Sequence, residues 1–376
     1  MTAPLEGLKV VELARVLAGP MIGQTLADLG AEVIKVESPE GDETRTWGPH
    51  YIDRDGDHSA SYFFCCNRGK RSVTANLKDP RDLARVQALA ADADVFIENF
   101  KVGGLTKYGL DYTALSAANP RLVYASVTGF GQTGPRAKQA GYDLLIQGMS
   151  GLMDITGDAD GPPQKLGIAI ADLLTALYGV IGIQAALKER ETSGRGQHID
   201  LALLDSMVAM LSNQASSYLA SGVGPRRMGA THPSIVPYQL FDVSDGQLLI
   251  ACGNNNLFQK FCTVIGRDSW ATDPRFATNQ DRLEHRDTLV ALITEALTAW
   301  SRDALIAELN AVAVPAAPIN SVAEALADPQ IAARELLIEP EGIRALRTPI
   351  VFSRSTLSLD RAPPKLGQDT DDVFGG

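Results

Sequence analysis

Two aspartates stand where apolar segments begin, and both could take part in chemistry. Asp172 follows the apolar run 168–171 and opens a segment, apolar nearly all round, that favours a buried helix to about Glu191. Asp143 precedes the apolar run 144–149. Each could simply cap its helix, because Asp is a preferred N-cap, and spacing alone favours that role. A helix N-terminus also keeps a carboxylate ionised, however, and such a group held away from water can be a covalent nucleophile.

The glycines at 129, 131 and 134 match the GxGxxG pattern of dinucleotide-binding loops and follow an expected strand. Pro135 and the polar segment 136–139 come next, where a dinucleotide fold requires the start of a helix. We therefore expect a mobile glycine loop near a binding site. An NAD-dependent oxidoreductase remains the alternative interpretation of this pattern.

Other catalytic and metal-binding motifs are missing from the sequence. There is no GxxxxGK[ST] phosphate loop and no GxSxG nucleophile turn. The five histidines lack the spacing of metal ligands, so we expect no metal. The four cysteines suit neither a disulfide framework nor a metal site, which favours a reducing compartment. Serine and zinc hydrolases of the usual kinds are therefore disfavoured.

The overall charge narrows the classes of partner. Lys and Arg number 34 against 45 Asp and Glu, a formal net charge of −11. An acidic surface repels nucleic acids and anionic lipids, so we expect neither as a partner. The first 13 residues lack the basic start of a signal peptide, and no uncharged apolar window could span a membrane. We expect a cytoplasmic protein whose anionic ligands, if any, meet cations locally.

The order of expected elements indicates an α/β fold. A β-branched run at 8–13, a helix at 21–29 and a second strand at 32–37 form a βαβ unit with parallel strands. Further strands are expected at 94–98, 122–127 and 198–203, with a helix at 81–91. Ligands are expected at the carboxyl ends of these strands.

A smaller α+β unit is expected after a flexible exit at 221–225. Its elements would be a hairpin at 238–241 and 247–252 with helices at 255–264 and 288–297. The Pro/Ala stretch 314–318 would lead the chain back.

Several segments, in order and at matching spacing, point to one family. They read LEGLKVVEL (5–13), AGP (18–20), LADLGAEVIKVE (26–37), GDETR (41–45), NRGKRS (67–72), IENF (97–100), GFGQTGP (129–135) and SGRGQ (193–197). Together they resemble the class III coenzyme A transferases, the formyl-CoA transferase and carnitine-CoA transferase group. The similarity extends over essentially the whole chain.

The resemblance assigns roles to individual residues. The family's catalytic aspartate falls on Asp172. The CoA contacts fall on Leu17, Ala18, Ala75, Asn76, Leu77, Lys78, Asn99, Phe100, Lys101, Lys107, Ala140, Gly141, Tyr142 and Asp143. Formyl-CoA transferases carry an arginine where this chain has Ser38, so we expect Lys70 or Arg71 to replace that contact.

The resemblance also implies the architecture and the reaction. A large Rossmann-like domain would be made from 1–220 and 325–376 and a small domain from 225–320, in an interlocked homodimer. Asp172 would move CoA between carboxylic acids through an aspartyl anhydride and an aspartyl-CoA thioester. CoA would be a substrate, and no further cofactor is implied. Glycine loops such as 129–134 could close over these hydrolysable intermediates.

The segment 226–239, with Gly253 to Asn255, is similar to the succinyl-CoA:glutarate type of transferase. A dicarboxylic acid would leave one free carboxylate, which Arg226, Arg227, His232 or Ser234 could hold. Surface arginines and a packed histidine explain the same residues equally well.

Two further functions compete with CoA transfer. Acyl-CoA racemases of the same fold need a histidine where this chain has Tyr142, and tyrosine is too weak an acid to replace it. A non-catalytic acyl-CoA-binding protein would not need Asp172.

Overall fold

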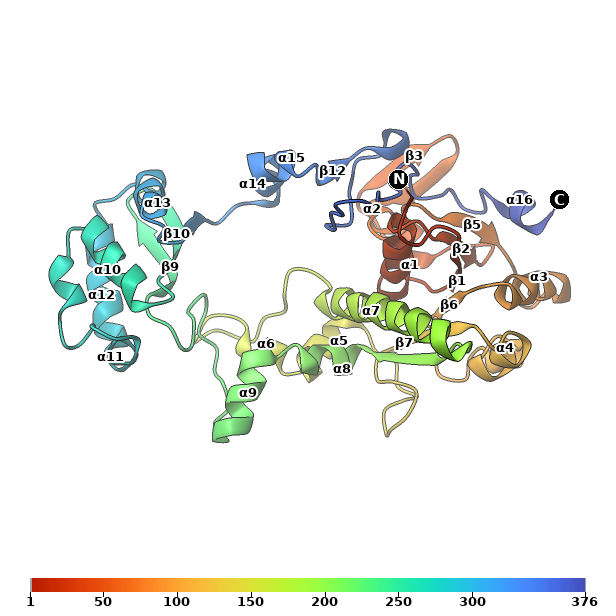
Figure 1. Cartoon of the computed structure of the whole chain (residues 1–376), viewed down its shortest axis with the longest axis horizontal. Helices are drawn as coiled ribbons and strands as arrows, with labels where there is room; N and C mark the ends of the chain where they lie inside the picture. Colours follow the sequence, from red (N-terminus) through yellow and green to blue (C-terminus); the bar gives the residue numbers. More distant parts are fainter. Residues whose placement is uncertain (1, 376) are drawn as a thin grey trace. The chain divides into compact units, whose positions relative to one another are not determined.

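Six parallel strands form the central sheet of the first of two units in this computed structural model, which describes residues 2–375. Figure 1 shows the sheet, whose order is β5-β2-β1-β6-β7-β8. The strands are β1 (Lys9–Leu13), β2 (Glu32–Glu37), β5 (Arg71–Thr74), β6 (Val95–Glu98), β7 (Val123–Thr128) and β8 (His198–Ala202). The predicted α/β fold with a parallel sheet is therefore confirmed.

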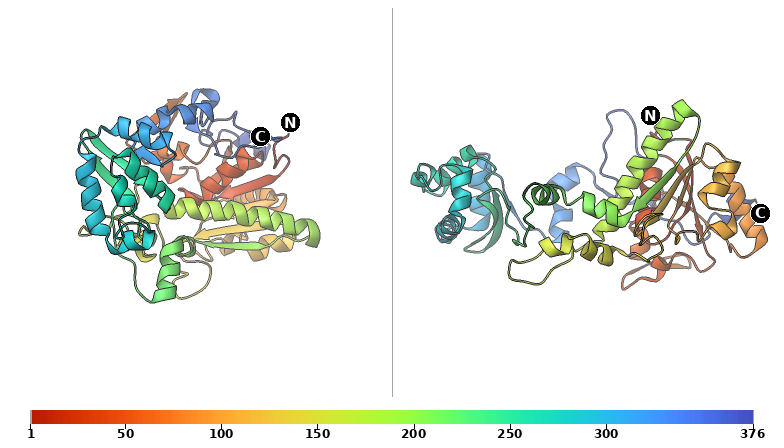
Figure 2. Two further views of the ribbon diagram at one scale, coloured as in Figure 1. Left: turned by 60° about the vertical axis from the view of Figure 1, so that its left-hand side comes forward. Right: turned by 90° about the horizontal axis from the view of Figure 1, so that it is seen from below.

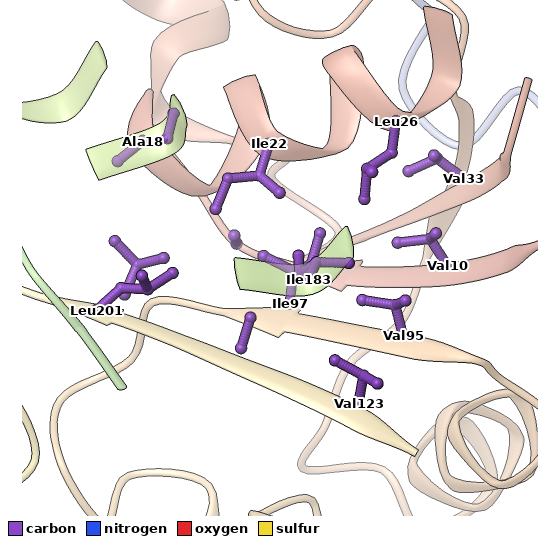
Figure 3. Packing of buried hydrophobic residues seen from close by; sticks show 14 of the residues in the cluster. Val10, Ala18, Ile22, Leu26, Val33, Val95, Ile97, Val123, Ile183 and Leu201 are labelled. Atoms are coloured by element: carbon purple, nitrogen blue, oxygen red, sulfur yellow. The ribbon is translucent and has the colours of Figure 1, made fainter. Parts of the chain in front are cut away.

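Helices cover both faces of this sheet because successive strand residues point to opposite sides. Val10 joins a core with α1 (Ala18–Asp28) and α7 (Ile170–Ser193). Figure 3 shows Ile22 and Leu26 of α1 on this face, above Val10 and Val95. Val11 packs on the other face, in the core formed with α3 (Pro80–Ala91) and α4 (Tyr112–Ala118). Figure 2 shows the two layers from other directions.

Helix α7 corrects two expectations. It begins at Ile170, so Asp172 lies inside the first turn and is not the N-cap. The helix is also not buried all round, because Leu177, Tyr178 and Ile181 are exposed. Within residues 2–375 it is the one helix whose length and mean hydropathy would suffice to cross a membrane, but its other face packs into the core of the first unit.

The second unit is built around a small antiparallel sheet of order β11-β10-β9. The predicted hairpin is confirmed as β9 (Tyr238–Val243) and β10 (Gly246–Ala251). Its helices are α10 (Asn255–Val264), α11 (Asn279–Glu284), α12 (Arg286–Leu297), α13 (Arg302–Ala311) and α14 (Val322–Ala327).

The boundaries of this unit differ from the expected ones in two places. The Pro/Ala stretch does not lead the chain back, because it forms the edge strand β11 (Ala316–Pro318) and the unit continues to Asp328. Residues 154–164 also belong to it, since Gly229 N–H donates to the carbonyl of Gly157 at 3.0 Å.

The remaining elements are short. They are η1 (Glu43–Thr46), β3 (Tyr51–Arg54), β4 (Asp57–Ala60), α2 (Ser61–Phe64), η2 (Thr106–Tyr108), α5 (Asp143–Met149), α6 (Leu152–Ile155), α8 (Leu203–Ala209), α9 (Ser212–Ser221), η3 (Asp268–Ala271), α15 (Pro329–Ala333), β12 (Leu337–Ile338), η4 (Pro340–Gly342), β13 (Ala345–Leu346) and α16 (Thr370–Phe374).

A buried ionic network lies beneath the junction between β1 and α1. Lys35 Nζ lies 3.2 Å from Glu12 Oε1 and 3.0 Å from Asp42 Oδ2, and Lys70 Nζ lies 2.8 Å from Glu12 Oε2. All four side chains are almost fully buried. Burial alone would lower the pKa of Lys35, but Glu12 and Asp42 outweigh it and raise that pKa.

The network leaves no room for a side chain at Gly23 of α1. A Cβ at Gly23 would lie 1.8 Å from Glu12 Oε2. Glu12 cannot simply turn away, because moving it would leave two buried ammonium groups without their shared partner. Gly23 is therefore required by the buried charges.

We predict that Gly23→Ala lowers the free energy of unfolding by roughly 3 kcal/mol, from overpacking and a disturbed ion pair. Gly148→Ala in α5 is the matched control, because its Cβ would make an ordinary 3.6 Å contact with Met153. The control should be neutral or stabilising by up to about 1 kcal/mol. Urea unfolding followed by circular dichroism measures both, and equal midpoints would contradict the steric argument.

Candidate active site

A cavity of about 190 Å³ opens in the first unit where β1, β6 and β7 end. Ligands of open α/β sheets bind at this edge. The cavity brings together segments from distant parts of the sequence and the first turn of α7. Its lining includes Arg15, Val16, Leu17, Ala18, Glu43, Asn99, Phe100, Lys101, Val102, Val127, Thr128, Gly129, Lys138, Gln139, Ala140, Gly141, Tyr142, Asp143, Asp172 and Leu203.

Asp172 reaches this cavity from the first turn of α7. Burial, and to a smaller extent the charge of Asp143, raise the pKa of Asp172 to about 7. A carboxylate of this basicity, with little water around it, is a better nucleophile than an ordinary aspartate. No hydrogen-bond donor among the described residues lowers this pKa again.

Asp143 takes the capping role that the sequence suggested for Asp172. Its Oδ1 accepts the N–H of Ala171 at 2.8 Å, and its Oδ2 accepts Gln147 Nε2 at 2.7 Å. Asp143 therefore satisfies a first-turn amide of α7 from outside that helix. Its carboxylate is held close enough to raise the pKa of Asp172.

Gln147 fixes the segment that leads into α7. It is fully buried on α5, and its Oε1 accepts the N–H of Leu166 at 2.9 Å while its Nε2 donates to the carbonyl of Ile168 at 3.3 Å. The backbone on the N-terminal side of Asp172 is thus held by side-chain hydrogen bonds rather than by regular structure.

Two glycines form one wall of the cavity from main chain. A Cβ at Gly129 would lie 2.6 Å from the Cα of Gly141, and a Cβ at Gly141 would lie 2.5 Å from the Cα of Gly129. Only glycine allows this approach. After Gly129, the N–H of Gln132 donates to Asp200 Oδ2 at 2.9 Å, so the loop is tied to β8. No helix follows the loop until α5 begins at Asp143, which argues against a dinucleotide fingerprint.

Asn99 joins the loops that follow β1 and β6. Its Oδ1 accepts the N–H of Arg15 at 2.9 Å, and its Nδ2 donates to the carbonyl of Arg15 at 2.7 Å. The guanidinium of Arg15 lies 5.6 Å from the ring centre of Phe100. Arg15 and Phe100 line both this cavity and a second one.

The second cavity has a volume of about 430 Å³ and lies where β1, β2 and β5 end. Its lining includes the predicted CoA residues Ala75, Asn76, Leu77 and Lys78, and also Leu13, Glu37, Ser38, Pro39, Glu40, Gly41 and Tyr108. Arg15 and Lys78 are the exposed cations beside Ser38.

Lys70 and Arg71 do not replace the contact that Ser38 cannot make, so that expectation is wrong. Lys70 is buried and bonds Glu12, the carbonyl of Pro20 and Asn67 Oδ1. Arg71 forms ion pairs with neighbouring carboxylates, including one of 2.8 Å between its Nη1 and Glu32 Oε1. Lys70 thus compensates charge in the core, and Arg71 pairs with Glu32 at the surface.

The structure gathers most of the predicted CoA residues and separates a few others. Nine line the first cavity: Leu17, Ala18, Asn99, Phe100, Lys101, Ala140, Gly141, Tyr142 and Asp143. Lys107 lies on η2, lines neither cavity, and its Nζ is 4.7 Å from the ring centre of Tyr108.

The four residues expected to hold the free carboxylate of a dicarboxylic acid all lie in the second unit. They are Arg226, Arg227, His232 and Ser234. Arg227 Nη1 donates to the carbonyl of Asp154 at 2.8 Å, so its guanidinium is already engaged. Ser234 N–H donates to His232 Nδ1 at 3.0 Å, which shapes this loop. Arg226 is exposed.

Sequence reasoning missed Arg15 and Lys138, two cations of the first cavity. Arg15 stands two residues after the first strand, a position that could have drawn attention to it. Lys138 lies in a polar loop with no pattern of its own.

Comparisons with known proteins agree on one family. The model of "CoA-transferase family III" matches residues 5–370. The chain is 50% identical, over 99% of its length and 95% of the relative, to the succinate–glutarate CoA-transferase of Agrobacterium fabrum. It is 39% identical to the succinyl-CoA:glutarate CoA-transferase of Homo sapiens, covering 99% of the chain and 85% of the relative. The crystal structure of a CAIB/BAIF family protein from Brucella suis shares 57% identity and a TM-score of 0.91 over 99% of both chains.

We predict that Asp143→Asn moves the pKa of Asp172 from about 7 down towards its ordinary value, because a negative charge beside it is lost. The asparagine oxygen can still accept the N–H of Ala171. Titration of ¹³Cγ-labelled aspartate by NMR, with Asp172→Asn for assignment, measures the shift. Asp92→Asn, at an exposed acid near Lys9, is the control. An unchanged midpoint in Asp143→Asn would show that burial alone sets this pKa.

Proposed function

Because the chain belongs to CoA-transferase family III and is therefore a CoA-transferase acting between carboxylic acids, we propose that it moves CoA from succinyl-CoA to a dicarboxylic acid. The observation that carries this proposal is the half-buried carboxyl of Asp172, whose raised pKa fits a nucleophile facing a cavity. The proposed acid rests on the names of two relatives, both of which pair succinate or succinyl-CoA with glutarate.

The proposed reaction begins at the thioester. A carboxylate oxygen of Asp172 attacks the thioester carbonyl of succinyl-CoA, the C–S bond breaks, and CoA leaves as a thiolate. The product on the enzyme is a mixed anhydride of Asp172 and succinate. Burial helps here because it strips water from the attacking carboxylate and keeps water away from the anhydride.

The thiolate then attacks the Asp172 carbonyl of the anhydride. The C–O bond breaks, succinate leaves, and CoA is held as a thioester of Asp172. The carboxylate of the second acid attacks this thioester, and the same steps in reverse form the new acyl-CoA and restore the Asp172 carboxylate. No oxidant, reductant or metal is needed for the balance.

Two cavities with a shared wall suit a long ligand such as CoA. We infer that the thioester lies in the cavity of Asp172 and the nucleotide in the cavity beside Ser38, with Arg15 and Phe100 between them. Lys78 and Arg15 would face the phosphates, which compensates locally for the acidic surface.

We propose a homodimer from the apolar surface that the single chain leaves uncovered. Helices α5, α7 and α8 pack on one another, and their outer faces expose large apolar side chains. These are Leu144, Leu145, Met149, Leu177, Tyr178, Ile181 and Val208. Apolar patches of this kind mark protein interfaces in soluble proteins.

To test the proposed reaction, we expect hydroxylamine to trap Asp172 as a hydroxamate when the enzyme is incubated with succinyl-CoA. Asp172→Asn should lose CoA transfer by at least about 10³-fold, because the variant has no nucleophile. Mass spectrometry of the peptide that holds Asp172 detects the adduct. A trapped residue other than Asp172, or exchange of α-hydrogen without transfer, would overturn the mechanism. Enzyme treated with a chelator should keep its activity.

The choice of acid is tested in the same assay. We expect kcat/KM for glutarate to exceed that for valerate, its monoacid of equal length, by about tenfold or more, because a charge-assisted hydrogen bond is lost. Arg226→Gln should narrow this ratio if Arg226 holds the second carboxylate. Equal values for the two acids would reject a dicarboxylate specificity while leaving CoA transfer intact.

We predict that Ile181→Asp converts the dimer to monomers, because a charge would be buried in the apolar interface. Light scattering coupled to gel filtration gives the mass of each form. Ala88→Asp, on the exposed side of α3 across the sheet, should leave the mass of a dimer. A wild-type chain that is already monomeric would end this proposal.

A further inference from the structure

Glu98 is a buried carboxyl that the proposed reaction does not use. It ends β6, is 5% exposed, and directly precedes the loop of Asn99 and Phe100. Its Oε2 accepts the N–H of Phe100 at 2.7 Å. It lines neither the cavity of Asp172 nor that of Ser38. It instead lines a third cavity, of about 230 Å³, behind the same loop.

No buried cation among residues 2–375 pairs with Glu98. The groups that face it are Tyr124 and Ser126 on β7, His198 on β8, Asp111 before α4, and Lys101 on its own loop. The Ser126 hydroxyl lowers the pKa of Glu98, and it lies 2.9 Å from His198 Nε2. Burial lowers the pKa of His198, which favours the neutral ring, and Lys101 is exposed.

Burial therefore dominates the titration of Glu98 and raises its pKa to about 7, against smaller opposite effects of the bonds from Ser126 and Phe100. A carboxylate accepts a stronger hydrogen bond from an amide than a neutral carboxyl does. The bond that holds the Phe100 amide thus strengthens as the pH rises through neutrality.

This bond acts on the wall that the two large cavities share. Phe100 lines both cavities, and its neighbour Asn99 holds the backbone of Arg15 by two hydrogen bonds. A displaced Phe100 amide would move Asn99 and so loosen the loop of Arg15. The charge of Glu98 is in this way linked to the position of Phe100 and Arg15 in the wall that the two cavities share.

We propose that Glu98 is a positioning residue, whose ionised carboxylate orders the loop of Asn99 to Lys101 for coenzyme A and makes the affinity for coenzyme A depend on its charge. This inference rests on the proposed function, because it takes CoA as the ligand of these cavities. Glu98 itself does not touch the reacting atoms.

The experiment measures the dissociation constant of free CoA by calorimetry at pH 6 and pH 8, for wild type and Glu98→Gln. Free CoA carries no acyl group, so no step at Asp172 contributes. We expect the glutamine variant to bind about fivefold more weakly at pH 8 and nearly equally at pH 6, where Glu98 is mostly neutral. At each pH, the dissociation constant of the variant is divided by that of wild type. The titration of the CoA phosphates affects both constants equally and therefore cancels.

Two further variants separate positioning from general stability. Glu98→Ala, which loses the acceptor altogether, should bind CoA about tenfold more weakly at pH 8 and raise KM for acyl-CoA more than it lowers kcat. Asp111→Asn is the matched control, because Asp111 lines the same small cavity but caps α4 through Ala114 N–H. Its CoA affinity should stay within about twofold of wild type.

The outcomes are distinguishable. If wild type fails to bind CoA, the proposed function itself is wrong. If wild type binds CoA and Glu98→Gln binds equally well at pH 8, or with the same deficit at both pH values, the role of Glu98 is overturned. A lower melting temperature with unchanged CoA affinity would assign Glu98 a purely structural role.

Discussion

The geometry of the site depends on charges buried under the first strand–helix junction. Val16 adopts a positive φ of 71°, a costly conformation for a β-branched residue. Two hydrogen bonds stabilise the loop in this conformation. Asp42 accepts the N–H of Val16, and Lys35 donates to the carbonyl of Ala14 at 2.8 Å. Lys35 can be buried because Glu12 and Asp42 share its charge. The loop that places Arg15 in both cavities is therefore held by hydrogen bonds from buried charged side chains to its backbone.

Asp143 and Asp172, at the other side of the cavity, have different roles. Asp143 accepts two hydrogen bonds, from Ala171 N–H and from Gln147 Nε2, whereas burial raises the pKa of Asp172. The same residue type thus serves as a cap in one place and as a candidate nucleophile in the other. Environment makes the difference, since both lie at the beginning of a helix.

Periodicity predicted the regular parts of the fold and failed where tertiary contacts decide. The strand at 32–37 and the helix at 255–264 have the predicted bounds, because alternation and amphipathicity are local signals. The cap of α7 was misassigned, since Asp143 reaches it from 28 residues away. Lys70 cannot replace the contact missing at Ser38, because Glu12 and Asn67 surround it, and the sequence does not show these neighbours. The role of Asp172 came from family resemblance, because spacing alone favoured a cap.

The contact between Gly129 and Gly141 has a consequence for how such a site can change. Two backbones that touch without side chains between them make a surface whose polar groups belong to the peptide units and not to side chains. Neither position can vary while the other backbone stays in place. We therefore expect a change in the acid that this site accepts to come from the surrounding loops and not from the two glycines.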